Sequence, residues 1–512
     1  MKPREWFLGI DLGTGSCKSV VLDPQARILG FGSMEYPAWD VESRWEEQDP
    51  ESLLEAALNS AGKAVQDAGV EPGGCQGLSL GGALHSLLVL GREDRPLSGV
   101  ITWADNRAVK QALSARQEGK AQKLYQETGC PAHPMYPLYK ILWLKENRPG
   151  LYQEAWRFVS AKEYVLWKLT GELVVDPSIA SGSGLLQVQT LRWSPLALEI
   201  AGIGEARLSE LCLPTELMGS LKEEAARKMK LLPGTPVILG SSDAVNSSLG
   251  AGAIKPSQAT CMVGTSGALR VISPRPILDP HARTWCYGLD QEHWIVGGAI
   301  NNGGVALAWM RDLLNQAFSL ETTAGPISFE QILELAAQVG PGAGGVLCLP
   351  FFAGERSPGW NLNAKAAFLG LTLEHGLPHL ARSLLEGVCF RFRSIQEVLG
   401  EIGLQVEEIV ASGGFTKSSF WMQLMADILG MPLRVPAWGE TSALGAALWA
   451  LCAGQGAGPL EELGRLVRLG LSVQPDRERA GAYDLLYPMY KEAYRCLQPL
   501  FERMVRAGEE PG

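Results

Sequence analysis

Two short turns of glycine and hydroxyl residues, each between apolar segments, constrain the fold of this chain most. The first covers residues 13–16 (Gly-Thr-Gly-Ser) and the second covers residues 264–267 (Gly-Thr-Ser-Gly). The segments around them have the length and composition of strands: 6–11, 18–22, 259–263 and 268–272. The sequence therefore predicts two β-hairpins about 250 residues apart. Their similarity suggests two related halves that face each other.

The chain is also long enough for two domains. A polypeptide of 512 residues exceeds what one hydrophobic core usually supports. We expect an N-terminal domain over 1–250 and a C-terminal domain over 251–512, with a boundary near the small residues of 249–252. Apolar spacing in the last part of the chain, at 482–504, predicts a helical C-terminal extension.

Composition argues against several classes of partner. Forty-five Lys and Arg face 55 Asp and Glu, so the net charge is −10, and nucleic acid or an anionic membrane surface is disfavoured. The ten cysteines are scattered without C-x-x-C spacing, which favours reduced thiols. No uncharged run approaches the roughly 20 residues of a membrane span. We therefore expect a cytoplasmic protein.

The first turn has the chemistry of a phosphate-binding loop. Glycine lets backbone amides come close to a ligand, and hydroxyls add donors. Thr14, Gly15 and Ser16 form the turn, with Lys18 two residues further on. Asp11 stands at the end of the preceding strand, where it could hold hydrated Mg²⁺ against phosphates. The alternative is an ordinary hairpin in which Asp11 satisfies turn amides.

Three further segments add to this hypothesis. The second turn, with Gly264 and Thr265, lacks a preceding acid and is by itself a tight β-turn; two such loops could hold an ATP tail from both sides. Gly413 and Gly414 precede a predicted helix at 418–429, where they could admit an adenine ring or simply allow a turn with positive φ.

Asp243 follows the apolar strand 236–239 and opens a run of small residues. It could be a helix N-cap or a general base that accepts a hydroxyl proton. Both interpretations stay open on the residues alone.

In their order and spacing these pieces resemble the FGGY carbohydrate kinases of the actin, hexokinase and heat-shock-chaperone ATPase superfamily. Residues 135–147 (MYPLYKILWLKEN) match the first signature of that family throughout. Residues 366–386 correspond to the second signature and depart from it at Leu384. Gly15 also departs, because many members have Thr or Ser there. The resemblance covers about residues 6–455.

The resemblance implies an α/β fold of two ribonuclease-H-like domains, with mixed sheets flanked by helices and a cleft between them. ATP would bind mainly to the C-terminal domain and sugar to the N-terminal one. Asp243 would be the base and Asp11 would organise Mg²⁺. The remaining nucleotide contacts would come from residues that match family positions: Thr14, Ser16, Lys18, Gly264, Thr265, Gly304, Gly414 and Ser418.

Within the family the likeness is greatest to gluconate kinases, with xylulokinases as the nearest rival. The stretches that carry it are 84–86, 101–107, 133–135, 294–304 and 354–358; the last has no role that the sequence assigns. The expected reaction is phosphorylation of D-gluconate at C6 by Mg·ATP.

The sugar-side residues are the least determined by sequence. Trp103 could flank the carbon chain, and Asp105 and Asn106 could bind hydroxyls. The carboxylate of gluconate requires a cation, for which the candidates are His85, Arg107 and Lys140. The alternatives place Trp103 in the core, Arg107 in a local ion pair and Lys140 on a solvated helix face.

Other functions remain as alternatives. One is a pentulose or other polyol kinase, a second is a non-metabolic ATPase of the same superfamily, and a third is an inactive sugar-binding regulator. A homodimer is a possible assembly.

Overall fold

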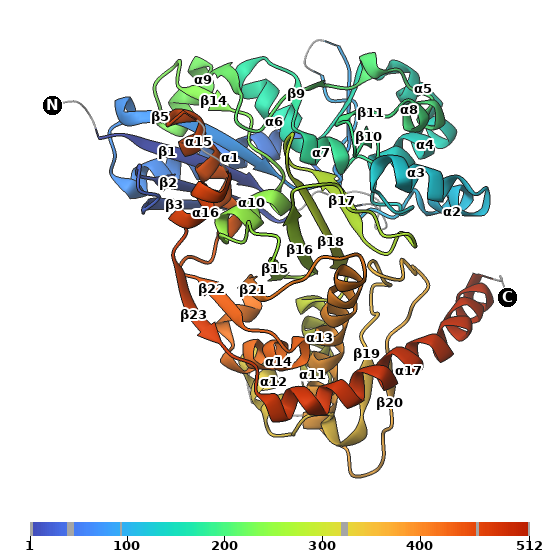
Figure 1. The fold of residues 1–512 in the computed structure, drawn as a ribbon. Helices are drawn as coiled ribbons and strands as arrows, with labels where there is room; N and C mark the ends of the chain where they lie inside the picture. The colour runs from blue at the N-terminus through green and yellow to red at the C-terminus, as the bar shows by residue number, and fades with distance from the viewer. Residues whose placement is uncertain (1–3, 38–45, 93–94, 319–325, 457–459, 510–512) are drawn as a thin grey trace.

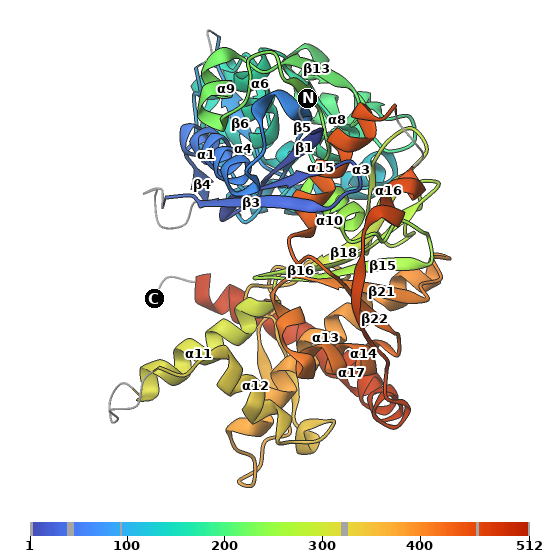
Figure 2. The same cartoon turned by 90° about the vertical axis from the view of Figure 1, so that its left-hand side faces the viewer.

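The chain forms two lobes, each built on its own sheet (Figures 1 and 2). The computed structural model describes residues 4–37, 46–92, 95–318, 326–456 and 460–509. The upper lobe in Figure 1 contains the blue and green N-terminal part of the chain, and the lower lobe contains most of the orange C-terminal part. Within these residues no helix is both long and apolar enough to cross a membrane.

The first lobe contains a six-stranded sheet in the order β13-β14-β5-β1-β2-β3. Its strands are β1 (Trp6–Leu12), β2 (Ser16–Leu22), β3 (Ile28–Glu35), β5 (Cys75–Gly82), β13 (Leu217–Ser220) and β14 (Pro236–Ile238). β1 pairs antiparallel with β2 and parallel with β5, and β14 runs parallel to β5. The carboxyl ends of β1, β5 and β14 therefore meet at one edge.

The second lobe repeats this pattern in a seven-stranded sheet, ordered β17-β18-β16-β15-β21-β22-β23. Its strands are β15 (Gln258–Val263), β16 (Gly267–Ser273), β17 (Trp285–Gly288), β18 (Trp294–Ile300), β21 (Glu408–Ser412), β22 (Leu433–Pro436) and β23 (Leu469–Val473). β15 pairs antiparallel with β16 and parallel with β21, as β1 does with β2 and β5. Both predicted hairpins, and the predicted relation between the halves, are confirmed.

Local signals account for several helix boundaries. α1 (Pro50–Ala68) begins after Asp49, whose side chain accepts from two backbone amides of the first turn, and it ends at Gly69 in the left-handed conformation. The predicted helix near 418 is α14 (Ser419–Leu429), capped by Ser418. The predicted C-terminal helix is α17 (Arg477–Glu509), which crosses the second lobe beside α14 and α13 (Leu377–Glu401).

One helix from late in the chain packs on the first lobe. α15 (Thr441–Gly454) lies against β1, β5 and α10 (Asp243–Gly250), and Figure 1 shows it in red among the blue strands. Glycines allow the close approach. A Cβ on Gly9 would lie 2.2 Å from the backbone nitrogen of Ala447, and one on Gly445 would lie 2.0 Å from the carbonyl oxygen of Asn246.

Candidate active site

The carboxyl edge of the first sheet brings two acidic side chains together. Asp11 on β1 is level with Gly81 on β5, and Gly82 forms a bridge with Ser242, directly before Asp243. Clefts at the carboxyl ends of parallel strands are common ligand sites in open α/β sheets. The two carboxylates, 232 positions apart in the sequence, share this edge.

Asp11 is a buried carboxylate with unused hydrogen-bonding capacity. It is 7% exposed, and its Oδ1 has no partner within the described residues. Burial, followed by the nearby charge of Asp243, raises the pKa of Asp11 to about 7. Gly81 leaves the space, since a Cβ there would lie 3.0 Å from Asp11 Oδ1. A buried, unsatisfied oxygen of this kind fits a cation ligand.

Asp243 is the first residue of α10, but it is not the cap. Ser242 is the N-cap and its side chain accepts from the amide of Val245, so the capping interpretation of Asp243 is wrong. Its Oδ1 accepts from the amide of Ala244 at 2.8 Å. Burial raises the pKa of Asp243, and the charge of Arg270 opposes that rise.

Arg270 is a site residue that the sequence analysis missed. It lies on β16 of the second lobe and donates from Nη1 to the carbonyl oxygen of Ala244 at 3.0 Å. A lone arginine inside the apolar strand GALRVIS was the available signal. It joins the second sheet to the helix that carries Asp243.

The first turn presents an open surface to a ligand. Gly13 closes it by donating from its amide to the carbonyl of Ser16 at 3.1 Å. Thr14 and Gly15 are exposed, and a Cβ on Gly15 would meet no atom within 4 Å. Lys18 is half-buried and pairs with Glu440 at 2.6 Å, so its charge is shared with the start of α15.

The second turn borders a pocket of about 710 Å³ in the second lobe. Ligand pockets commonly enclose about 300–1,000 Å³, so a nucleotide fits. Five residues assigned to the nucleotide from the sequence line it: Gly264, Thr265, Gly304, Gly414 and Ser418.

Glycines set the shape of this pocket. The amide of Gly304 donates to the carbonyl of Gly264 at 2.7 Å, which docks α11 (Gly304–Phe318) on the turn. Gly413 has a φ of 91°, and a Cβ there would lie 2.4 Å from the carbonyl oxygen of Val263. Gly413 therefore shapes the pocket without lining it.

The apolar wall of the pocket was not predicted. Part of it comes from α11 and α12 (Phe329–Ala337), through Val305, Leu307, Ala308, Phe329, Leu333 and Ala337, and part from Val263, Phe415, Phe420 and Trp421. The amphipathic pattern of α12 signals a buried face but does not say that the face covers a ligand.

His85 lies beside the carboxylate edge in a constrained conformation. Its φ is 67°, a value uncommon for a residue other than glycine. Its Nδ1 donates to the carbonyl oxygen of Gly182 at 2.7 Å, and burial lowers its pKa to about 3. The ring is neutral, so Nε2 is an acceptor. His85 can bind a hydroxyl but not a carboxylate.

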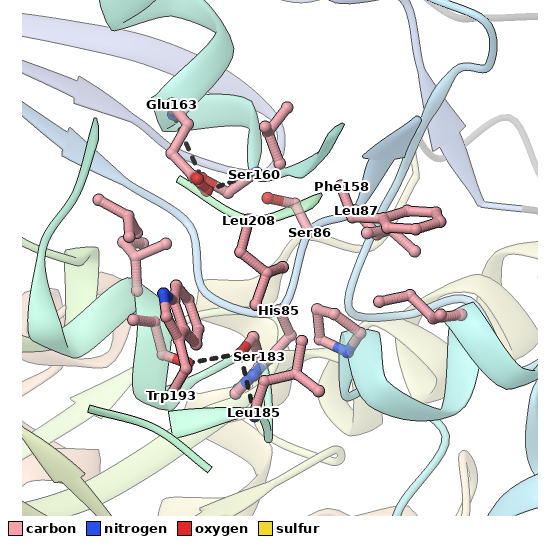
Figure 3. A pocket seen from close by; sticks show the side chains of 16 residues that line it. His85, Ser86, Leu87, Phe158, Ser160, Glu163, Ser183, Leu185, Trp193 and Leu208 are labelled. Atoms are coloured by element: carbon pink, nitrogen blue, oxygen red, sulfur yellow. Dashed lines mark hydrogen bonds between the residues drawn. The ribbon is translucent and has the colours of Figure 1, made fainter. Parts of the chain in front are cut away.

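A small cavity lies on one side of His85 (Figure 3). It encloses about 30 Å³ among mostly apolar side chains such as Leu185, Trp193 and Leu208. That volume holds only a few water molecules, which is too little for a sugar.

The other residues predicted on the sugar side have different surroundings. Asp105 and Arg107 bind each other, and Arg107 Nη2 also donates to Glu47 at 2.6 Å; this is the local ion pair of the alternative. Asn106 is exposed. Trp103 is partly buried against the hydrophobic core, as the alternative expects, and it also donates from Nε1 to Thr14 Oγ1 at 3.0 Å, so it supports the first turn.

Lys140 is buried rather than solvated. It donates to the carbonyl oxygens of His85 and Thr102, each at 2.7 Å, and burial lowers its pKa to about 7. Two carbonyls occupy its ammonium group, so it orders the backbone on either side of the site.

A nucleotide-sized pocket on one lobe, with a buried carboxylate (Asp11) next to a half-buried one (Asp243) on the other, is the arrangement of a two-domain phosphotransferase. Residues 6–250 match the N-terminal domain of the FGGY family of carbohydrate kinases, and residues 259–454 match the C-terminal domain. The chain belongs to this family. It is a carbohydrate kinase, and the family uses ATP as the phosphate donor.

Individual relatives agree. A gluconokinase of Bacillus licheniformis is 35% identical over 497 residues, 96% of each chain. The crystal structure of a gluconate kinase from Lactobacillus acidophilus superposes with a TM-score of 0.91 at 32% identity, covering 98% of this chain and 100% of that one. A ligand-bound xylulose kinase from the same organism gives 0.91 at 33% identity, with the same coverage.

Proposed function

We propose that the chain is a gluconokinase, which transfers the γ-phosphoryl group of Mg·ATP to the C6 hydroxyl of D-gluconate. The observation that carries the proposal is the adjacency of Asp11 and Asp243 beside an open glycine-hydroxyl turn. The curated relative with 35% identity, a gluconokinase, supports the choice of acceptor.

Asp243 acts as the general base. Phosphoryl transfer has a loose transition state, so the base mainly orients the hydroxyl and takes its proton late. A raised pKa suits proton acceptance near neutral pH, and the charge of Arg270 favours the ionised form of the carboxylate.

Asp11 fits a Mg²⁺ ligand, because its Oδ1 is buried and unpartnered within the described residues. In that part of the chain no three His, Cys, Asp or Glu side chains gather as a metal site, and Mg²⁺ commonly takes one or two carboxylates, waters and substrate phosphates. Bound there, the ion would neutralise phosphate charge. Thr14, Gly15 and Ser16 would bind the phosphates from one lobe, and Thr265 from the other.

A substrate panel tests the proposal. ADP release is measured with saturating ATP and D-gluconate, D-xylulose, D-ribulose, glycerol or no acceptor. We expect the highest kcat/KM for gluconate and little turnover without acceptor. ATP turnover that no polyol changes would exclude kinase activity toward all four.

A pentulose kinase is the second candidate, favoured by the 33% identity to the Lactobacillus xylulose kinase. A higher kcat/KM for xylulose than for gluconate would establish it. We further propose a division into 1–250 and 251–512, with α15 as the exception that packs on the first lobe, together with a cytoplasmic location. A homodimer is testable by light scattering.

A further inference from the structure

The segment 354–358, which has no role in the mechanism above, brings an arginine from the second lobe to the first. The guanidinium carbon of Arg356 lies 4.8 Å from the ring centroid of Trp103. Arg356 is 7% exposed. Its Nη2 donates to the carbonyl oxygen of Ile300 at 2.9 Å, and its Nε has no partner within the described residues. The site therefore contains a buried guanidinium whose Nε is an unused donor.

No carboxylate compensates this charge within the described residues. The ionisable groups that act on Arg356 are Tyr136, Tyr287 and a second cation, Arg270. Burial lowers the pKa of Arg356 to about 10. A buried, unpaired charge is costly, and native proteins usually pair it. An anion from outside the chain would provide the missing partner.

His133 supplies another unused donor in the same place. The backbone amide of Met135 donates to its Nδ1 at 3.2 Å, so the neutral ring carries its proton on Nε2. His133 is 4% exposed and Nε2 has no partner in the described part of the chain. Burial lowers its pKa, and so do the surrounding groups, of which Arg356 acts most strongly. Nε2–H is thus a neutral donor in a cationic environment.

We propose that Arg356 and His133 bind the carboxylate of an aldonate substrate and so select a sugar acid over a neutral polyol. The proposal rests on the proposed gluconokinase function and extends it. A guanidinium offers a planar fork of donors that suits a carboxylate. Arg270 interacts electrostatically with both Arg356 and Asp243, so it lies near both ends of the proposed site. The substrate would run from this anion site to the base.

The other nearby cations are already engaged. Asp105 and Glu47 bind Arg107, and two carbonyl oxygens bind Lys140. Arg270 Nε also has no partner within the described residues, but Arg270 donates to the carbonyl oxygen of Ala244 and its charge acts on Asp243. Arg356 is the arginine whose charge acts most strongly on His133, where the second free buried donor lies.

The test compares D-gluconate with D-glucitol, which has a hydroxymethyl group in place of the carboxylate. Dissociation constants are measured by calorimetry without ATP, and kcat/KM with ATP, for wild type and Arg356→Gln. Removing one partner of a buried charge pair typically weakens binding roughly 30- to 4,000-fold. We expect a gluconate loss in this range in Kd and in kcat/KM, with glucitol constants within about threefold of wild type.

Three variants complete the design. Arg356→Lys keeps the charge without the fork and should show an intermediate loss for gluconate alone. It also decides the matter if Arg356→Gln fails to fold. His133→Leu should weaken gluconate more than glucitol. Arg393→Gln, on α13 in an ion pair with Asp484, is the control and should match wild type.

Two results would overturn the inference. Equal losses for gluconate and glucitol would mean that Arg356 only holds the lobes together, and an unchanged gluconate Kd would mean that it does not contact the substrate. Either result leaves the proposed function intact if wild type phosphorylates gluconate. If wild type does not phosphorylate gluconate, the proposed function fails and the inference fails with it.

Discussion

The two aspartates at one sheet edge, Asp11 (buried) and Asp243 (half-buried), differ in the groups that offset the effect of burial on their pKa values. Asp243 faces Arg270, which lowers its pKa against the effect of burial. The charge of Asp243 adds to the effect of burial and raises the pKa of Asp11. Lys18 and a hydrogen bond from Ser442 offset this rise only in part. Pairs of acids held in different environments commonly take different roles in one reaction. Here Asp243 is suited to proton acceptance and Asp11 to a metal ion.

Replacing Asp243 by Asn should separate chemistry from nucleotide binding. The amide keeps the shape but cannot accept the hydroxyl proton, so kcat should fall about 10²- to 10⁴-fold. In the proposed site ATP binds mainly in the pocket of the other lobe, so its Kd should stay within about twofold. Steady-state kinetics and nucleotide titration measure both, and a variant with more than half of wild-type turnover would remove Asp243 from the base role.

Asp11 gives a prediction about stability and pH in the absence of Mg²⁺. Its pKa is about 7 in the folded chain, against an ordinary value of 3.8. Its contribution to stability is therefore complete below about pH 4 and is lost as the pH rises through 7. Between pH 5 and pH 8 the loss should be about 2–3 kcal/mol.

The Asp11→Asn variant should not show this loss. Urea unfolding gives the free energy of unfolding of the variant and of wild type at pH 5 and pH 8. Subtracting the change between the two pH values in the variant from that in wild type cancels the other titrating groups. Relative to wild type, the variant should therefore be more stable at pH 8 than at pH 5. It should also lose Mg·ATP-dependent turnover. The same difference in unfolding free energy between variant and wild type at both pH values would contradict the raised pKa of Asp11.

At the scale of elements, the contact between α10 and α15 depends on glycines. Gly445→Ala would place a Cβ 2.0 Å from the carbonyl oxygen of Asn246, so the helices must separate. Overpacking of this kind costs about 1–3 kcal/mol. We expect that loss of unfolding free energy in urea, and a lower kcat, because α10 carries Asp243.

Gly400 provides the matched control. It lies in α13, and a Cβ on it would meet no atom within 4 Å, so Gly400→Ala should leave stability unchanged or raise it by up to about 1 kcal/mol through helix propensity. Equal effects of the two substitutions would show that α10 and α15 tolerate a wider spacing.

The sequence predicts those parts of the molecule whose signals are local. The turn residues identify both hairpins, and Asp49 and Gly69 mark the ends of α1. Arg356 and His133 lie in stretches that resemble gluconate kinases, but their neighbours are distant in sequence, so no local pattern defines their role. α15 is apolar on nearly every side. This pattern indicates burial but does not identify the sheet on which the helix packs.

At the scale of the whole molecule, one face of the first sheet is covered by α15, whose residues come from beyond 250. Trp449 on α15 donates from Nε1 to Ser241 Oγ at 2.8 Å and to Asn246 Oδ1 at 2.9 Å. Phe7, Leu448 and Ala447 belong to one buried cluster. A fragment ending at residue 250 would therefore expose an apolar face and unpaired polar groups.

We expect the fragment 1–250 to lack a native fold by itself. Near-ultraviolet circular dichroism and urea unfolding, compared with the full chain, measure this. The fragment should show weak aromatic signals and no cooperative transition, because its exposed face favours aggregation. A cooperative transition in the isolated fragment would show that α15 is dispensable for the fold of the first lobe.

The position of α15 also affects how the protein folds during synthesis. On a ribosome, 190 residues must be added after residue 250 before the first residue of α15 is made. At roughly 5–20 residues per second this takes about 10–40 s. During that interval the nascent first lobe has an uncovered sheet, so its yield in a cell should depend on the chaperones that shield such surfaces.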